Sequence, residues 1–139
     1  MASTFNDVRS AIEGRVATEM ALSPSYQVSY QNVPFTAPNG APWIRAAIRF
    51  GDNAYATLMA PAAGKNRQVG TVVVDVFTQT GVGAGSNFTI AERLKDLFDR
   101  QIVNGIIFDA ASGPAQILPS SPEGHYQTQI TITFEAYLE

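Results

Sequence analysis

The 139-residue chain contains no cysteine and only one histidine, His125. Disulfide bonds and thiolate metal sites are therefore excluded, and a zinc site would have to rest on carboxylates, which is unusual. A serine triad would need His125 as its base, but no serine lies in a Gly-x-Ser-x-Gly motif. We therefore expect no catalytic centre and no metal, with His125 in a structural or solvent-exposed position between Gly124 and Tyr126.

Charged residues and long apolar runs are also scarce. Only 15% of the residues are charged, and the formal net charge is -3, which argues against a protein that holds nucleic acid by counterion release. No apolar run approaches the ~20 residues that span a bilayer. The first residues show no signal peptide. We expect one soluble domain over residues 1–139, made in a cytoplasm, with 45% hydrophobic residues to build its core.

A strand, a glycine-rich loop and a helix occupy the centre of the chain. Residues 69–79 are rich in valine, which is typical of a buried strand, and residues 81–87 then break the pattern. Thr89 and Glu92 have the spacing of a capping box, which predicts a helix start, and Asn104-Gly105 can end that helix. The apolar positions expected on one side of this helix are Ile90, Leu94, Leu97, Phe98 and Ile102.

The glycine-rich loop has the general position of a nucleotide-binding turn. Gly81-x-Gly83-x-Gly85 follows a strand and precedes a helix, but the third glycine of the dinucleotide fingerprint is missing. No parallel strand with a terminal acid lies at the right distance, and no Gly-Lys-Ser/Thr is present. We therefore expect a flexible connection and no cofactor. A small-ligand binding domain that uses this loop remains the alternative from another functional class.

The other segments complete the predicted fold. Thr4 and Asp7 have capping-box spacing, and an apolar stripe follows to about Leu22, with Pro24 as a stop. The last predicted strand alternates strictly between apolar and polar residues, so one of its faces should be buried. The order of helices and strands predicts an α+β fold: a mainly antiparallel β-sheet with two α-helices packed on one face. The remaining strands are expected at residues 26–32, 43–50, 106–110, 115–118 and 126–138. Residues 51–53 are expected to form a turn, after which residues 54–59 either extend the sheet or are irregular.

Two groups of residues have the composition of contact surfaces. Trp43, Arg45 and Arg49 should share the outward face of one strand, and exposed tryptophan and arginine are enriched at interface hot spots. Alternatively, Trp43 packs under the proline-rich loop 33–42 and the arginines pair with nearby acids. The second group, Lys65, Asn66 and Arg67, ends the loop at residues 60–68. Long loops rich in small residues often become ordered only against a partner.

Three parts of the chain, in their order and spacing, resemble one protein family. They are Asn32-x-Pro34-Phe35-x-x-Pro38 with Trp43 and Ile48; Arg67-x-x-Gly70-x-Val72-x-Val74-x-Val76-Phe77 with the glycines and the helix through Phe98; and Gly124-x-Tyr126 leading to Ile130-x-Ile132-x-Phe134. Together they cover most of the chain from Tyr26 onward. They are similar to the tail terminator proteins of long-tailed bacteriophages, the group that includes the lambda tail terminator.

The resemblance implies an α+β structural protein of the virion without catalysis. Proteins of this family assemble as a hexameric ring on the finished tail tube, at the head-proximal end of the tail. The ring stops addition of tube subunits and offers a surface to the head connector or neck protein. DNA would pass through it without specific binding, and the acidic composition is compatible with that passage. The rival roles in the same machine are a head-completion or neck protein and a tail-tube subunit.

Overall fold

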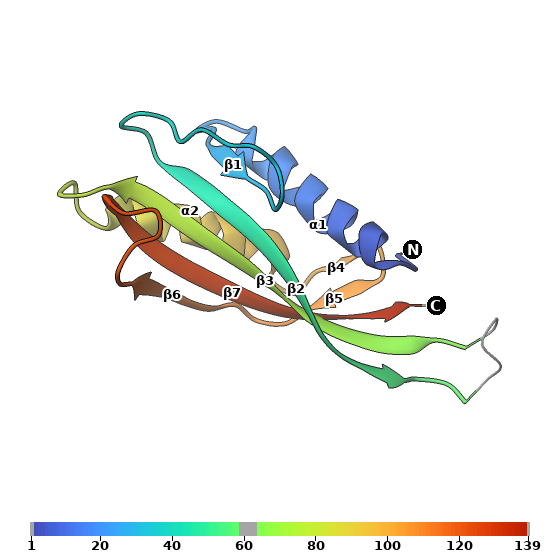
Figure 1. Cartoon of the computed structure of the whole chain (residues 1–139). Coiled ribbons are helices and arrows are strands. Elements are labelled where there is room, and N and C mark those ends of the chain that lie inside the picture. The colour runs from blue at the N-terminus through green and yellow to red at the C-terminus, as the bar shows by residue number, and fades with distance from the viewer. Residues whose placement is uncertain (1, 59–63, 139) are drawn as a thin grey trace.

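The computed structural model describes residues 2–58 and 64–138 and has the predicted α+β architecture. Within these residues, α1 and α2 pack on one face of a twisted sheet of seven strands (Figure 1). Neither of the described helices is long and apolar enough to cross a membrane. In chain order, the elements are α1 (Phe5–Met20), β1 (Gln27–Ser29), β2 (Trp43–Tyr55), β3 (Asn66–Gln79), α2 (Gly85–Phe98), β4 (Ile102–Val103), β5 (Ile106–Phe108), β6 (Ser112–Ile117) and β7 (His125–Leu138).

The sheet is built around β3 and β7, which pair antiparallel along their whole length. Asn66 lies opposite Leu138 at one end of this pair, and Gln79 lies opposite His125 at the other. The strand order is β1-β2-β3-β7-β5-β4, and β6 pairs with β7 beside this path. Among the strands of the described residues, only the short pairing of β1 with β2 is parallel. The mainly antiparallel sheet is therefore confirmed.

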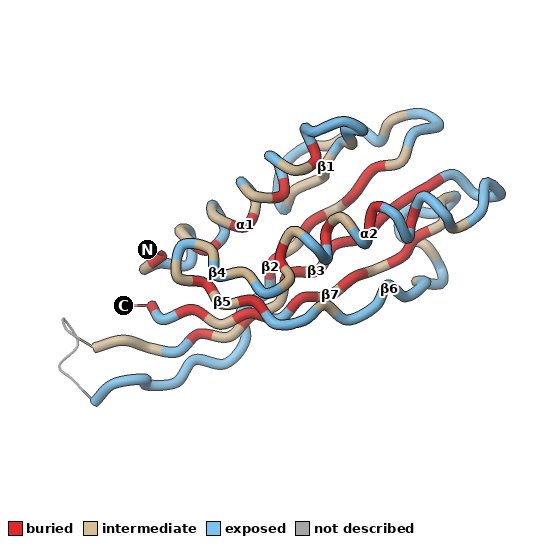
Figure 2. Tube along the Cα trace, turned by 180° about the vertical axis from the view of Figure 1, so that it is seen from behind, coloured by how far each residue is buried: buried red, intermediate tan, exposed pale blue. Residues whose placement is uncertain are grey.

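The main core lies between the sheet and the helices, as the alternating and helical apolar patterns predict. Figure 2 shows the buried positions along the facing sides of the helices and the central strands. The side chains that make it up come from every layer, and all are at most 1% exposed: Val8, Ile12, Val16, Met20, Val72, Val74, Val76, Ile90, Leu94, Phe98, Ile130, Ile132 and Phe134.

The predicted capping box of α1 is confirmed, whereas the one predicted for α2 is wrong. The Asp7 amide donates to Thr4 Oγ1, and Thr4 amide donates to the Asp7 carboxylate, each at 3.1 Å. In contrast, α2 begins one turn before Thr89, at Gly85, and no side chain caps its first turn. Thr89 lies inside the helix and its hydroxyl donates to the Gly85 carbonyl. The start of α2 is held instead by Asn87, whose side-chain amide donates to the Val76 and Tyr126 carbonyls of the sheet.

The end of α2 also differs from the expectation. The helix stops at Phe98, and Arg100 adopts the left-handed conformation just beyond it, with φ of 56°. Ile102 is therefore not a core position of the helix but a residue of β4, 70% exposed. Asn104 and Gly105, both with positive φ, form the two-residue turn between β4 and β5. Asn-Gly is a preferred sequence for such hairpin turns, so this signal marked a hairpin rather than a helix end.

Two strands extend beyond their predicted limits. β2 continues from residue 50 to Tyr55, and β3 begins at Asn66 rather than at residue 69. The last part of the loop predicted at residues 60–68 is therefore strand, while residues 60–63 of it lie outside the described residues. β6 likewise begins at Ser112 instead of residue 115. The consequence is a hairpin that is longer than the sequence pattern indicated.

Candidate functional site

The extended β2–β3 hairpin projects from one end of the molecule (Figure 1). We call residues 51–58 and 64–68 the arm. Every residue from 51 to 58 is exposed, so the part of β2 that belongs to the arm is pale blue in Figure 2. Tyr55 is 82% exposed and Leu58 is 97% exposed. Large apolar side chains with this degree of exposure can mark contact surfaces.

A buried glutamine holds the root of the arm where β2 leaves its regular register. The register of β2 on β3 shifts between Phe50 and Asn53. Gln68 is 2% exposed and its amide donates to the Gly51 and Val69 carbonyls, both at 2.8 Å. Asn53 Nδ2 donates in turn to Gln68 Oε1 at 2.7 Å. Because the backbone groups at this irregularity have a partner, the arm leaves the body in a defined direction.

The predicted contact residues Lys65, Asn66 and Arg67 all belong to the arm. The amide of Ala56 donates to the Lys65 carbonyl at 3.0 Å, and the Lys65 amide donates to the Thr57 hydroxyl at 2.9 Å. Arg67 forms an ion pair with Glu135 of β7. The hydrogen bond to the Glu135 carboxylate raises the pKa of the Arg67 guanidinium. These residues therefore anchor one side of the arm to the sheet.

The sequence predicted that Trp43 would be exposed on the outward face of its strand. This prediction is wrong, because Trp43 is only 3% exposed. It stacks on Phe77 at 4.1 Å between ring centroids and lies 5.0 Å from Phe35 of the proline-rich loop. His125 packs edge-on against the same two rings, Trp43 and Phe77. Trp43 Nε1 and His125 Nδ1 are buried without a hydrogen-bond partner among the described residues. The structure thus favours the alternative interpretation, in which Trp43 packs under loop 33–42.

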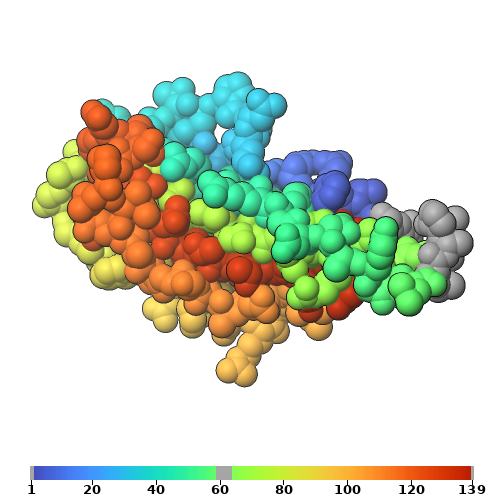
Figure 3. All heavy atoms as spheres, turned by 60° about the horizontal axis from the view of Figure 1, so that its bottom comes forward, coloured from blue at the N-terminus to red at the C-terminus, as the bar shows by residue number. Residues whose placement is uncertain are grey.

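Arg45 also pairs inside the protein rather than pointing freely into solvent. Its guanidinium contacts the Asp75 carboxylate at 3.2 Å, donates to the Ser121 carbonyl at 2.8 Å and lies 5.0 Å from the centre of the Phe77 ring. Asp75 is 4% exposed and accepts two more hydrogen bonds, from Gln127 at 2.9 Å and Gln129 at 3.0 Å. This network attaches the loop before β7 to the helix-free face of the sheet, where Figure 3 shows that loop in orange.

Arg49 remains available on the helix-free face. Its side chain is exposed, and within residues 2–58 and 64–138 it makes no ion pair or hydrogen bond. Arg49 and Arg67 line one depression of about 320 Å³, together with the acids Asp109 and Glu135. The structure therefore brings Arg49 together with the arm residues and separates it from Trp43 and Arg45. In the described part of the chain, no cluster of three metal-ligating side chains occurs.

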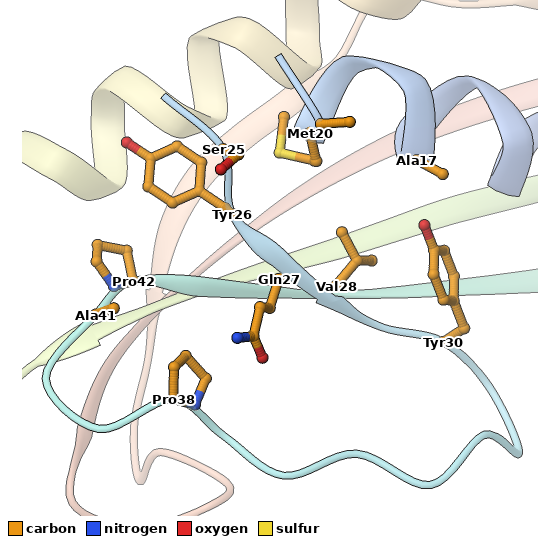
Figure 4. A pocket seen from close by; sticks show the side chains of 11 residues that line it. Ala17, Met20, Ser25, Tyr26, Gln27, Val28, Tyr30, Pro38, Ala41 and Pro42 are labelled. Atoms are coloured by element: carbon orange, nitrogen blue, oxygen red, sulfur yellow. The ribbon is translucent and has the colours of Figure 1, made fainter. Parts of the chain in front are cut away.

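An apolar groove of about 590 Å³ lies at the end of the molecule away from the arm (Figure 4). The C-terminal end of α1 forms one wall, the proline-rich loop forms the other, and β1 lies between them. Val28 of β1 and Tyr30 just after it point toward α1, whereas the Tyr26 ring lies on the side of α2, where the Arg93 guanidinium is 5.6 Å from its centre. Burial, with a smaller effect of Glu13, raises the pKa of the Tyr30 hydroxyl. We call this the groove, with its lining residues Ala17, Met20, Ala21, Ser25, Tyr26, Gln27, Val28, Tyr30, Pro38, Ala41 and Pro42.

Comparison with protein families identifies the chain. A profile described as phage tail terminator protein matches residues 7–134, which is nearly the whole sequence. The chain belongs to the phage tail terminator family. This tail terminator is therefore a structural phage tail protein, and a phage tail protein is a component of the virion. The family is structural and is not known for enzymatic activity.

Solved structures agree with this tail terminator in fold. Sixteen solved chains match. One of them, which carries no functional name, is 23% identical, covers 96% of each chain and superposes with a TM-score of 0.69. This likeness supports the fold alone. No curated protein matches the sequence.

The residues that sequence reasoning missed lie on the helix-free face of the terminator. Asp75 and Phe77 alternate with the core valines of β3, and this signal placed them on the outer face. Nothing in the local pattern indicated that two loops would cover that face and bury both side chains. Tyr55 and Leu58 were missed because a turn was predicted at residues 51–53 and the sequence left residues 54–59 open between sheet and irregular structure. The aromatic residue in an uncharged segment after Asn53 was the signal that could have identified them.

Proposed function

We propose that this terminator caps the completed tail tube as a homohexameric ring. The ring ends addition of tube subunits and provides the attachment surface for the head connector or neck protein. It sits at the head-proximal end of the virion tail after synthesis in the host cytoplasm. The family match over residues 7–134 is the observation that carries the proposal. We also propose that residues 1–139 act as one domain in this role.

The shape of the chain supports assembly into a ring. The arm and the groove are different surfaces at opposite ends of the molecule (Figure 1), and contacts between unlike surfaces generate rings when the rotation closes. One face of such a ring continues the pattern of the tube and docks on it, whereas the other face lacks that pattern and ends the polymer. The net charge of -3 favours passage of DNA through the ring without specific binding.

The predicted contact residues divide into two roles in this proposal. Arg49, Lys65, Asn66 and Arg67 form a contact surface toward the tube or the neighbouring protomer, since they lie on the arm or beside it. Trp43 and Arg45 act indirectly by holding the loops that border the groove and the helix-free face.

Electron microscopy of particles from a phage that lacks this gene tests the proposed function. We expect overlong tubes of variable length that are not attached to filled heads, with normal tails restored by expression of the wild-type protein. Tails of normal length beside separate heads would instead assign the protein to the neck. Intact infectious particles without the gene would refute a role in tail completion.

A further inference from the structure

The tip of the arm displays the most exposed large apolar side chains of the described chain. Leu58 and Tyr55 are 97% and 82% exposed, more than Leu118 at 77% or Ile102 at 70%. They lie in the segment 53–58, Asn-Ala-Tyr-Ala-Thr-Leu, which has no charged residue. The ladder between β2 and β3 and the bonds to Lys65 hold this segment extended up to Thr57. The segment that carries Tyr55 is thus held in place by its pairing, and Leu58 follows directly after it.

The groove has the complementary chemistry. The described residues that line it include no charged side chain, and its volume of about 590 Å³ lies in the usual range of binding sites. Met20 supplies an adaptable apolar wall, and Tyr26, Pro38 and Pro42 supply rigid ones. β1 is the terminal strand of the sheet, and among the described residues no strand pairs with its outer edge. An extended segment can therefore bind there through both main-chain and apolar contacts.

The arm cannot bind in the groove of its own chain, because the two lie at opposite ends of the molecule (Figures 1 and 2). In an assembly of several copies, the arm of one copy can bind in the groove of the next. Such a head-to-tail contact leaves one arm and one groove available at the ends of every open chain, until closure into a ring uses both.

We infer that each protomer inserts Tyr55 and Leu58 of its arm into the groove of the next protomer. This inference rests on the proposed ring and names the surfaces that close it. Tyr55 and Leu58 enter the space between Met20 and Pro38, and the exposed edge of the arm lies along β1. Removal of these two apolar side chains from water stabilises the contact, and the gain is repeated at each contact of the ring.

Disulfide trapping tests the contact directly, because the natural chain has no cysteine. The double variant Leu58→Cys with Ala17→Cys places one thiol on the arm and one in the groove, both at exposed positions. The variant is expressed in hosts infected by the gene-deleted phage, and the tails are isolated and mildly oxidised. We expect a ladder of disulfide-linked species up to the closed ring, lost on reduction. The matched control, Leu58→Cys with Ser10→Cys, has its second thiol on α1 outside the groove and should give no ladder.

A second variant separates the contact from folding. Tyr55→Ser with Leu58→Ser changes only exposed side chains, so its thermal unfolding should match the wild type while capping of tails is lost. Capping by this variant, or the absence of a ladder from tails that the double-cysteine variant caps, would overturn the inference. Loss of capping without any ladder would place the arm on the tube. None of these outcomes tests the proposed function itself. The proposed function is refuted only if deletion of the gene leaves the tails intact.

Discussion

Single polar residues buried in the sheet decide how its segments are arranged. Asp75, Gln68 and Asn87 are each at most 4% exposed, and each makes several hydrogen bonds across different segments. A buried polar group without partners costs free energy, whereas one with a full set of partners allows only one arrangement of its neighbours. A substitution that removes the hydrogen bonds of one such residue should therefore destabilise the segments that the residue connects.

Arg45→Met tests the network beneath the loops. The substitution keeps an unbranched apolar stem but removes the guanidinium, and it leaves the Asp75 carboxylate with only its two glutamine donors. We expect the free energy of unfolding to fall by about 1–3 kcal/mol, because a buried acceptor loses a charged partner. Urea denaturation measures it. Arg9→Met removes an exposed i,i+4 pair and serves as the control, with a change of about 0.5 kcal/mol or less. Equal effects would contradict the prediction.

Asp7 makes the stability of α1 depend on pH. Hydrogen bonds from the Ser3 amide and then from Thr4 lower the pKa of the exposed Asp7 carboxyl below its usual value. A lowered pKa in the folded state stabilises the protein above the unfolded pKa, and this contribution is lost as the pH falls through the folded pKa. Wild type should therefore be more stable than Asp7→Ala at neutral pH, with a difference that narrows below about pH 4. Thermal unfolding across pH measures this; a constant difference would refute it.

At the scale of the element, the two helices begin by different means. α1 starts with a local capping box, which the sequence shows. α2 starts without a side-chain cap, and Asn87 in its first turn is bound to the strands beneath it. Asn87 Nδ2 donates to the Val76 carbonyl and the Tyr126 carbonyl, at 3.2 and 3.3 Å, and Thr78 Oγ1 donates to Asn87 Oδ1 at 2.6 Å. The position of α2 is therefore set by β3 and β7.

Asn87→Ala should destabilise the protein by about 1–3 kcal/mol, because it leaves buried carbonyl and hydroxyl groups without partners. Chemical denaturation gives the free energy of unfolding. Ser86→Ala, at the preceding and exposed position in the same turn, is the matched control and should change little. If the two variants were equally stable, the contacts of Asn87 would not hold the helix.

The arm as an element depends on Gln68. Gln68→Met keeps the volume but removes the donors to the Gly51 carbonyl and the acceptor for Asn53. We expect amide hydrogen exchange in the arm to become at least tenfold faster, which corresponds to about 1.4 kcal/mol, with the rest of the sheet unchanged. Gln116→Met, an exposed glutamine of β6, is the control. Unchanged exchange in the arm would show that Gln68 does not brace it.

At the scale of the whole molecule, the sequence placed Arg45 and Arg49 in one contact surface, but the structure gives the two arginines different roles. Arg45 belongs to the internal network, so reversing its charge would place a carboxylate beside the buried Asp75 and disturb folding. Arg49 has no such partner in the described chain, which makes it the suitable position for a test of assembly.

Arg49→Glu should abolish capping of tails while the unfolding temperature stays within about 2 °C of wild type, as is usual for surface substitutions. Complementation of the gene-deleted phage and electron microscopy measure capping, and calorimetry measures unfolding. Arg100→Glu reverses another exposed charge, just beyond α2, and this variant should cap tails normally. Normal capping by Arg49→Glu would remove Arg49 from the contact surface.

The sequence by itself determined the features that depend on local chemistry. The capping box of α1, the alternation of β7 and the valine face of β3 each follow from neighbouring residues, and together they define the α+β fold. The family motifs also follow from the order of residues along the chain, and the profile match over residues 7–134 agrees with them. Such signals are readable because their physical cause lies within a few positions.

Only the tertiary structure decided which outward-facing residues are covered. Trp43 and Arg45 alternate like surface positions, yet Trp43 is buried against Phe77 and His125, and Arg45 binds Asp75 and the Ser121 carbonyl. The start of α2 was misplaced because Asn87 is held by strands up to 41 residues away rather than by a neighbouring cap. The arm extends past Phe50 because Gln68 supplies hydrogen bonds across an irregular register. In each case the deciding partner is far along the chain, and only folding brings it into contact.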